Sequence, residues 1–126
     1  MMTIIDPGFP IPTNKAIKKE IYIHYINAFT KLNNLLENTC ESASLTVDLW
    51  TAKNKHGYIG ITLHWLSDDF KIFNCLLGME RMTYPHSGEK ISMCLRKKVY
   101  EFGLDGRITC VVVTDKFSKK NFSTFF

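Results

Sequence analysis

The segment that most constrains the fold is RITCVVV at residues 107–113, which is almost continuously apolar from Ile108 onward. Such a run is typical of a strand that is buried on both faces of a sheet. It follows residues 87–102, where apolar side chains recur at steps of three and four, as in an amphipathic helix. A strand that follows a helix usually joins a parallel neighbour through a right-handed crossover. The sequence therefore predicts a sheet with at least one parallel pair.

Three more strand-like runs, rich in β-branched and aromatic residues, precede that helix. They span residues 44–50, 58–66 and 70–79. The connections between them are short and polar, at residues 51–57 and 67–69. Because short loops favour antiparallel neighbours, these three strands should form a meander.

An amphipathic helix is expected before the first strand. Residues 1–14 form an extended lead-in, because three prolines there disfavour helix, and Thr13 or Asn14 could cap a helix that starts at residue 15. From residue 15 to residue 37 apolar residues recur at helical spacing, which predicts a helix that packs on the sheet. The fold class is therefore α/β: an N-terminal helix, three antiparallel strands, a crossover helix and a fourth, parallel strand.

Composition narrows the class of protein only moderately. With 126 residues and a formal net charge of +4, the chain is at most one small domain whose charge fits a nucleic-acid partner. A surface with a slight excess of lysine explains the charge alone more simply. The four cysteines form no C-x-x-C pair, so a zinc knuckle is unsupported. There is no secretory-signal pattern and no apolar run long enough to span a membrane, so an intracellular protein is expected.

Two acidic residues occupy positions that this topology brings together. Asp48 lies within the first strand and Asp115 ends the fourth, and these two strands should be parallel neighbours. Adjacent carboxylates repel unless a cation neutralises them, and their hard oxygens suit Mg²⁺ or Mn²⁺. Such ions can activate a nucleophile in phosphodiester transfer. Either Asp alone is better explained as a turn former or cap, but the two together indicate a nuclease or transposase site.

Several other side chains have simpler structural interpretations. The histidines have no partner at i+4, so structural or solvent roles are favoured over metal binding for His56, His64 and His86. Trp50 and Trp65 could stack on bases, but packing between strands and helix is the preferred interpretation. Three cysteines in apolar stretches should behave as small hydrophobes: Cys75, Cys94 and Cys110.

Three stretches carry a resemblance to a known family. SLTVDLWTAKNKHGYIGITLHWL resembles the opening strands of hAT family transposases and of related domesticated BED-finger proteins. IIDPGFPIPTNKAIKKEI resembles the family's lead-in and first helix, and HSGEKISMCLRKKVYEFGLDGRITCVVVTD resembles its segment through the second acid. The resemblance implies a ribonuclease-H-like fold and metal-dependent DNA strand transfer. The resemblance also implies that Asp48 and Asp115 are the first two acids of an Asp–Asp–Glu triad and that the protein is nuclear.

The sequence also departs from the family pattern. Lys116 follows Asp115 and would compete with a metal for the acids, and the family's third acid has no counterpart. Glu80, Glu89 and Glu101 are expected in a loop, residues 80–86, and on the surface helix, so none of them replaces it.

We therefore expect an incomplete domain that is cut off after the second acid. It consists of an extended lead-in at residues 1–14, a partial ribonuclease-H-like domain at 15–115 and a divergent basic and aromatic tail at 116–126.

The leading hypothesis is a transposase-derived, catalytically inactive chain, with no cofactor or with residual Mg²⁺ or Mn²⁺. One alternative is a small nuclear interaction module that binds a related full-length transposase. Another is a divalent-metal-dependent phosphodiester enzyme that obtains its third acid from a partner chain. The expected partners are DNA, by resemblance, and such a transposase. Neither a membrane nor a small-molecule substrate is expected.

Overall fold

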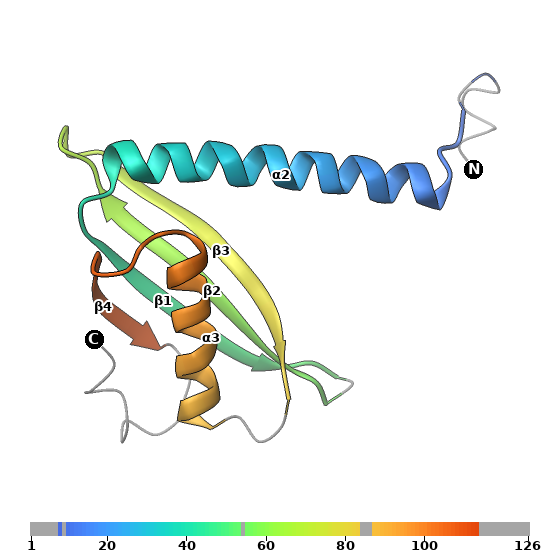
Figure 1. Ribbon diagram of the computed structural model, residues 1–126. Coiled ribbons are helices and arrows are strands. Elements are labelled where there is room, and N and C mark those ends of the chain that lie inside the picture. Colours follow the sequence, from blue (N-terminus) through green and yellow to red (C-terminus); the bar gives the residue numbers. More distant parts are fainter. Residues whose placement is uncertain (1–7, 9, 54, 84–86, 114–126) are drawn as a thin grey trace. The chain divides into compact units, whose positions relative to one another are not determined.

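The computed structural model describes residues 8, 10–53, 55–83 and 87–113 (Figure 1). The elements, in chain order, are α2 (Asn14–Thr39), β1 (Ala43–Thr51), β2 (Gly57–Leu66), β3 (Ile72–Met82), α3 (Gly88–Glu101) and β4 (Ile108–Val113). The chain divides into two compact units, Met1–Asn34 and Leu35–Phe126. The first contains most of α2, and the second contains the last turn of α2 and everything after it.

The four strands form one mixed sheet in the order β3-β2-β1-β4. β1 pairs with β2 and β2 pairs with β3 in antiparallel fashion, while β1 and β4 are parallel. The predicted α/β fold is thus confirmed: an antiparallel meander, a crossover helix and a parallel fourth strand.

Helix α2 begins where the sequence predicts a cap. The Thr13 hydroxyl accepts a hydrogen bond from the backbone N–H of Ala16 at 3.2 Å, as an N-terminal cap does. The helix runs to Thr39, two residues beyond the predicted end. None of the helices that the structure describes is long and apolar enough to cross a membrane.

The last turn of α2 is fixed within the second unit by side-chain hydrogen bonds. The Arg107 guanidinium donates to the carbonyl oxygens of Cys40 at 3.0 Å and Leu36 at 3.4 Å. The Trp65 indole donates to the Thr39 hydroxyl at 3.0 Å. The Leu36 carbonyl also accepts from the Cys40 N–H at 3.0 Å, so Arg107 reinforces the end of the helix.

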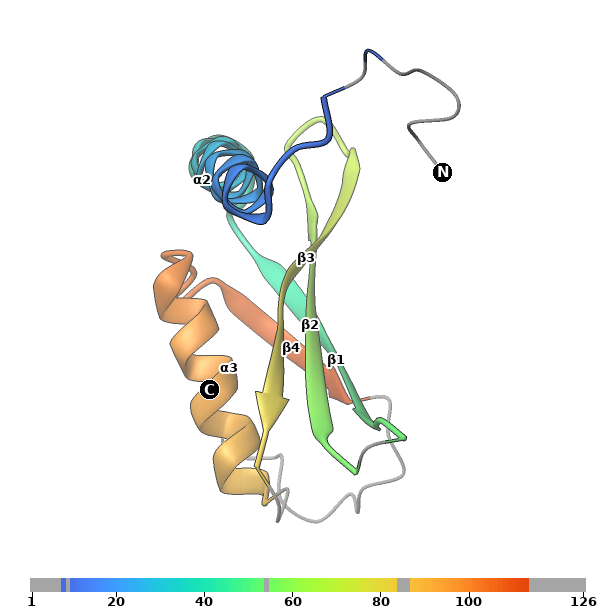
Figure 2. The same cartoon turned by 90° about the vertical axis from the view of Figure 1, so that its right-hand side faces the viewer.

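Helix α3 covers one face of the sheet, and the core lies between them (Figure 2). The core residues of β1 and β2 on this covered face are fully buried, and α3 adds every fourth residue from Ile91 to Val99. Together they are Leu45, Val47, Ile59, Ile61, Leu63, Ile91, Leu95 and Val99. Buried and less buried residues alternate along β1, as the sequence predicts.

Ser87 caps the N-terminus of α3, because its hydroxyl accepts a hydrogen bond from the Lys90 N–H at 3.3 Å.

Strand β3 contains a β-bulge and is longer than the sequence predicts. Ile61 pairs with Gly78 but Thr62 pairs with Leu76, so Leu77 is an extra residue. The bulge shifts the alternation, and the following part of β3 presents Glu80 and Met82 to the covered face. Because residues 80–82 pair with β2, the strand continues through Met82, which is buried, and the loop predicted from residue 80 is wrong at these positions.

The second face of the sheet is open among the described residues, and this corrects the prediction for β4. In β4 only Ile108 is buried, while Thr109, Cys110 and Val112 are exposed. Cys110 and Val112 pair with Ser44 and Thr46 and share their open face. The apolar run at residues 107–113 is therefore a strand at the sheet edge with one covered face.

Candidate functional site

Asp48 lies on the open face of the central strand β1 and is exposed. Its partner in the antiparallel ladder is Gly60 of β2, which has no side chain. No β2 side chain therefore stands beside the carboxylate, and the Trp50 ring covers Gly60 instead. This orientation is the one that strict alternation in β1 predicts.

The parallel pairing of β1 and β4 bears on whether the second acid, Asp115, lies near Asp48. The last described pair is Val47 with Val113. Asp48 follows Val47 directly, and Asp115 comes two residues after Val113. The strand arrangement on which the two-acid prediction depends is thus present. Asp115 itself lies outside the described residues, so its proximity to Asp48 stays a prediction.

Glu80 belongs to the covered face, opposite to Asp48. Its carboxylate lies 3.3 Å from Lys98 Nζ and accepts from the Cys94 thiol at 3.5 Å, with Lys97 at 3.8 Å. Burial alone would raise the pKa of Glu80, but the hydrogen bonds from Lys98 and Cys94 and the two lysine charges lower it below its ordinary value. Glu80 is therefore a member of an ion-pair cluster in a strand, and its predicted place in a loop is wrong.

The other two glutamates lie where they were expected, on α3. Glu101 forms an ion pair with Lys98 at 2.8 Å, and Glu89 is in the exposed first turn. Burial and the negative charge of Glu80 together raise the pKa of the nearby Cys94 thiol to about 11. None of these groups shares the open face with Asp48.

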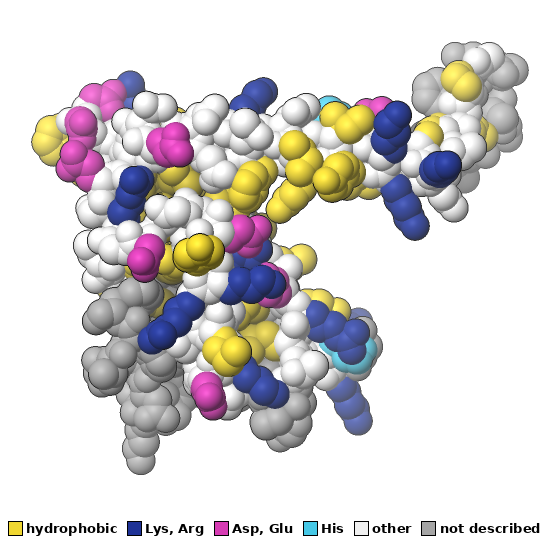
Figure 3. Space-filling model, viewed as in Figure 1, with side chains coloured by type: hydrophobic (Ala, Val, Ile, Leu, Met, Phe, Trp, Pro, Cys, Tyr) yellow, Lys and Arg dark blue, Asp and Glu magenta, His cyan; other side chains and the backbone are white. Residues whose placement is uncertain are grey.

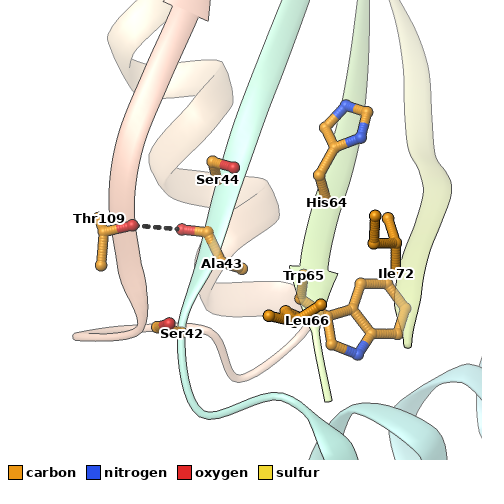
Figure 4. Close-up of a pocket in the computed structure, with 8 residues that line it drawn as sticks. All are labelled: Ser42, Ala43, Ser44, His64, Trp65, Leu66, Ile72 and Thr109. Carbon is orange, nitrogen blue, oxygen red and sulfur yellow. Dashed lines mark hydrogen bonds between the residues drawn. The ribbon is translucent and has the colours of Figure 1, made fainter. Parts of the chain in front are cut away.

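The open face also carries His64, whose ring is 2.9 Å from the Thr46 hydroxyl. Figure 4 shows His64 beside a pocket at the far end of β1 from Asp48, where Thr109 donates to the Ala43 carbonyl at 3.1 Å. The pocket is lined by Ser42, Ala43, Ser44, His64, Trp65, Leu66, Ile72 and Thr109. The contact between His64 and Thr46 fits the structural role that the sequence favoured for His64, while His86 lies outside the described residues.

The two tryptophans differ, which corrects half of their prediction. Trp65 is buried on the covered face and stacks on Phe73, with ring centroids 5.1 Å apart. Trp50 lies on the open face, 38% exposed, and stacks on Tyr58 at 5.8 Å. It is therefore not packed between strand and helix.

The cysteines differ in the same way. Cys75 and Cys94 are half-buried, in keeping with small hydrophobes, but Cys110 is exposed because it lies on the open face of β4.

Within the described ranges, no three His, Cys, Asp or Glu side chains gather closely enough to hold a metal ion. What the open face does provide is one exposed carboxylate opposite a glycine. Its oxygens are of the hard type that Mg²⁺ and Mn²⁺ prefer, so Asp48 fits these ions in donor chemistry.

Comparison with known proteins identifies a family that this chain resembles. The family model of the ZBED1 RNase-like domain matches residues 46–125, a range that includes both Asp48 and Asp115. No solved structure matches the chain.

Three relatives illustrate the similarity. The zinc finger BED domain-containing protein DAYSLEEPER of Arabidopsis thaliana is 30% identical over 82% of this chain and 15% of its own length. A putative AC transposase of Zea mays is 27% identical over 80% of this chain and 14% of its own length. The transposable element Hobo transposase of Drosophila melanogaster is 33% identical over 59% of this chain and 12% of its own length. The chain thus spans a small part of each relative, and its sequence, sheet topology and family match together show that it belongs to the ZBED1 RNase-like domain family and is hAT-transposase-like.

Proposed function

We propose that this chain is a transposase-derived segment that carries the first two acids of a divalent-metal site, Asp48 and Asp115, and that it does not cut DNA on its own. The observation that carries the metal site is the parallel register of Val47 with Val113, since each proposed acid follows its strand residue within two positions. When bound, Mg²⁺ or Mn²⁺ would activate a nucleophile and neutralise charge on a phosphodiester. Asp48 would hold the ion through its exposed carboxylate.

Two glutamates close to the sheet, Glu80 and Glu101, do not complete the site. Glu80 and Glu101 both pair with Lys98 and lie on the side of the sheet that α3 covers. They are thus separated from Asp48 by the sheet itself. Acids that work as a unit lose most of their activity when one is missing. Lys116, next to Asp115 in the sequence, would further compete with a metal for the carboxylates.

The partner class and the location are proposed from the relatives. Two of them are named as transposases, one of these of a transposable element, so we propose DNA as the macromolecular partner and the nucleus as the place of action. The mild positive charge of the chain, +4, supports a polyanionic partner.

A nicking assay tests the inactivity. The whole chain, incubated with end-labelled DNA and Mn²⁺, should leave the DNA intact, as should the Asp48→Asn variant. Mn²⁺-dependent nicking by the wild-type chain that Asp48→Asn abolishes would contradict the proposal, because the site would then be complete. The dependence on protein concentration then separates two cases: activity that rises more steeply than concentration would indicate that a second copy supplies the third acid, and a linear rise would indicate a site within one chain.

A further inference from the structure

Three side chains form a continuous row across the open face, next to Asp48. Trp50 of β1 pairs directly with Tyr58 of β2, and Tyr58 pairs directly with Arg81 of β3. Directly paired residues point to the same face of a sheet, so the row consists of two rings and one guanidinium group. The two rings are stacked, with centroids 5.8 Å apart and an interplanar angle of 19°.

Gly60 leaves room for the Trp50 ring beside it on the sheet. A Cβ atom at Gly60 would lie 3.2 Å from Trp50 Cζ3, so the indole occupies the space that a side chain on β2 would fill. The ring nevertheless stays 38% exposed. A stacked pair of this kind stabilises a sheet, but its exposed surface also offers an aromatic platform.

Positive charge lies next to this platform, at Arg81 and in the β1–β2 hairpin. One Arg81 guanidinium nitrogen lies 2.7 Å from Nδ1 of His56, at the end of the β1–β2 hairpin. Lys53 and Lys55 are exposed in the same hairpin. Figure 3, which views the sheet from the α3 side, shows Lys or Arg side chains next to a His side chain at that end of the sheet. None of the salt bridges found within the described residues involves these three cations.

We propose that Trp50, Tyr58 and Arg81, with the hairpin lysines, bind single-stranded nucleic acid. An unpaired base stacks on the Trp50–Tyr58 platform, and the adjacent phosphates contact Arg81 and the lysines. This proposal deepens the proposed function, on which it rests. Asp48 lies two residues from Trp50 on the same face, roughly 7 Å along the strand. A strand seated on the platform therefore passes beside the proposed metal ligand.

The test is fluorescence anisotropy of a labelled oligothymidylate of about 16 nucleotides, the upper end of single-strand site sizes. The wild-type chain should bind it, with affinity falling as salt rises. Trp50→Ala should weaken binding about tenfold through lost stacking. Arg81→Gln, which leaves the rings intact, should weaken binding and flatten the salt dependence. Because Trp65 is buried, quenching of tryptophan fluorescence by the oligonucleotide should come from Trp50 and vanish in Trp50→Phe.

Matched controls lie on α3, which packs on the other face. Tyr100→Ala and Arg96→Ala remove an exposed ring and an exposed guanidinium and should leave binding unchanged. Three outcomes would overturn the proposal: no binding by the wild-type chain, equal binding by Trp50→Ala and Tyr100→Ala, or equally tight binding of a duplex. Failure of the proposed metal site can be told apart from failure of the platform, because Mn²⁺ binding at Asp48 is measured without any nucleic acid.

Discussion

Leu45→Ala should lower the free energy of unfolding by about 3 kcal/mol, as expected for a large-to-small change in a rigid core. Leu45 is fully buried in the central strand, and its ladder partners are Leu63 on one side and Val111 on the other. With strands on both sides and α3 above, the neighbours cannot close the cavity. Urea denaturation followed by circular dichroism measures the change.

The matched control for Leu45→Ala is Thr46→Ala, one residue further along β1. Thr46 points to the open face, where it contacts His64, so its truncation should cost about 1 kcal/mol or less. Equal losses for the two variants would mean that α3 does not cover the Leu45 face. The described packing would then be wrong.

Lys98→Met should destabilise the fold by about 2 kcal/mol near neutral pH, because it leaves the Glu80 carboxylate without its nearest cation. The loss is smaller than the roughly 3–5 kcal/mol seen for fully buried pairs, since the Glu80 side chain remains 30% exposed. Lys98 itself is only 12% exposed, and its stem passes over Gly78, where a Cβ atom would lie 2.9 Å from Lys98 Cε. Methionine keeps this packing, so the variant isolates the charge.

The pH dependence follows from the Glu80 pKa. In the wild-type chain the folded pKa is lowered from its ordinary value of 4.5, so the stability from this group is present above that value and lost as pH falls through the folded pKa. Without Lys98, its hydrogen bond and its charge no longer lower the pKa of Glu80, so this pKa should be higher in the folded variant than in the folded wild-type chain. Protonation of Glu80 removes its unpaired charge in the Lys98→Met variant. The difference in unfolding free energy between this variant and the wild-type chain should therefore shrink as the pH falls from about 7 to about 4.

Two further variants complete the Lys98 test. Lys97→Met removes an exposed lysine at 3.8 Å and should cost less than about 0.5 kcal/mol. The double variant Lys98→Met, Glu80→Gln should recover part of the loss, because the Glu80 charge is gone and only Glu101 is left without its Lys98 partner. A Lys98→Met deficit that is independent of pH and is not recovered by Glu80→Gln would show that Lys98 acts through packing alone.

Local sequence patterns predicted the architecture well. Alternation in β1 placed Leu45 and Val47 in the core and Asp48 outside, because a strand has no other way to bury one face. The helix before residues 107–113 required a parallel partner, and β4 pairs with β1 accordingly. These features depend on residues that are close together in the sequence, so the sequence alone is enough to predict them.

Features that depend on register or on covering layers could not be predicted. Pairing with β2 extends β3 through the expected loop, and the bulge at Leu77 shifts the alternation so that Glu80 lies on the covered face. An apolar run looks the same in sequence whether one face or two are covered, so the exposure of Val112 was not evident.

The candidate site shows the same division. The pairing of Trp50 with Tyr58 and of Tyr58 with Arg81 depends on two hairpin registers at once, so the aromatic row appears only in the assembled sheet. The orientation of Asp48, in contrast, followed from alternation within one strand.

The central claim is that Asp48 and Asp115 together hold a divalent ion, and an amide NMR spectrum of the whole chain titrated with Mn²⁺ tests it most directly. Paramagnetic broadening should be confined to amides around Asp48, its ladder partner Gly60 and residues 113–115. It should disappear in Asp48→Asn and persist in Asp105→Asn, a matched change at an exposed turn. Broadening around Asp115 that leaves Asp48 and Gly60 sharp, or that survives Asp48→Asn, would contradict the claim that the two acids form one site.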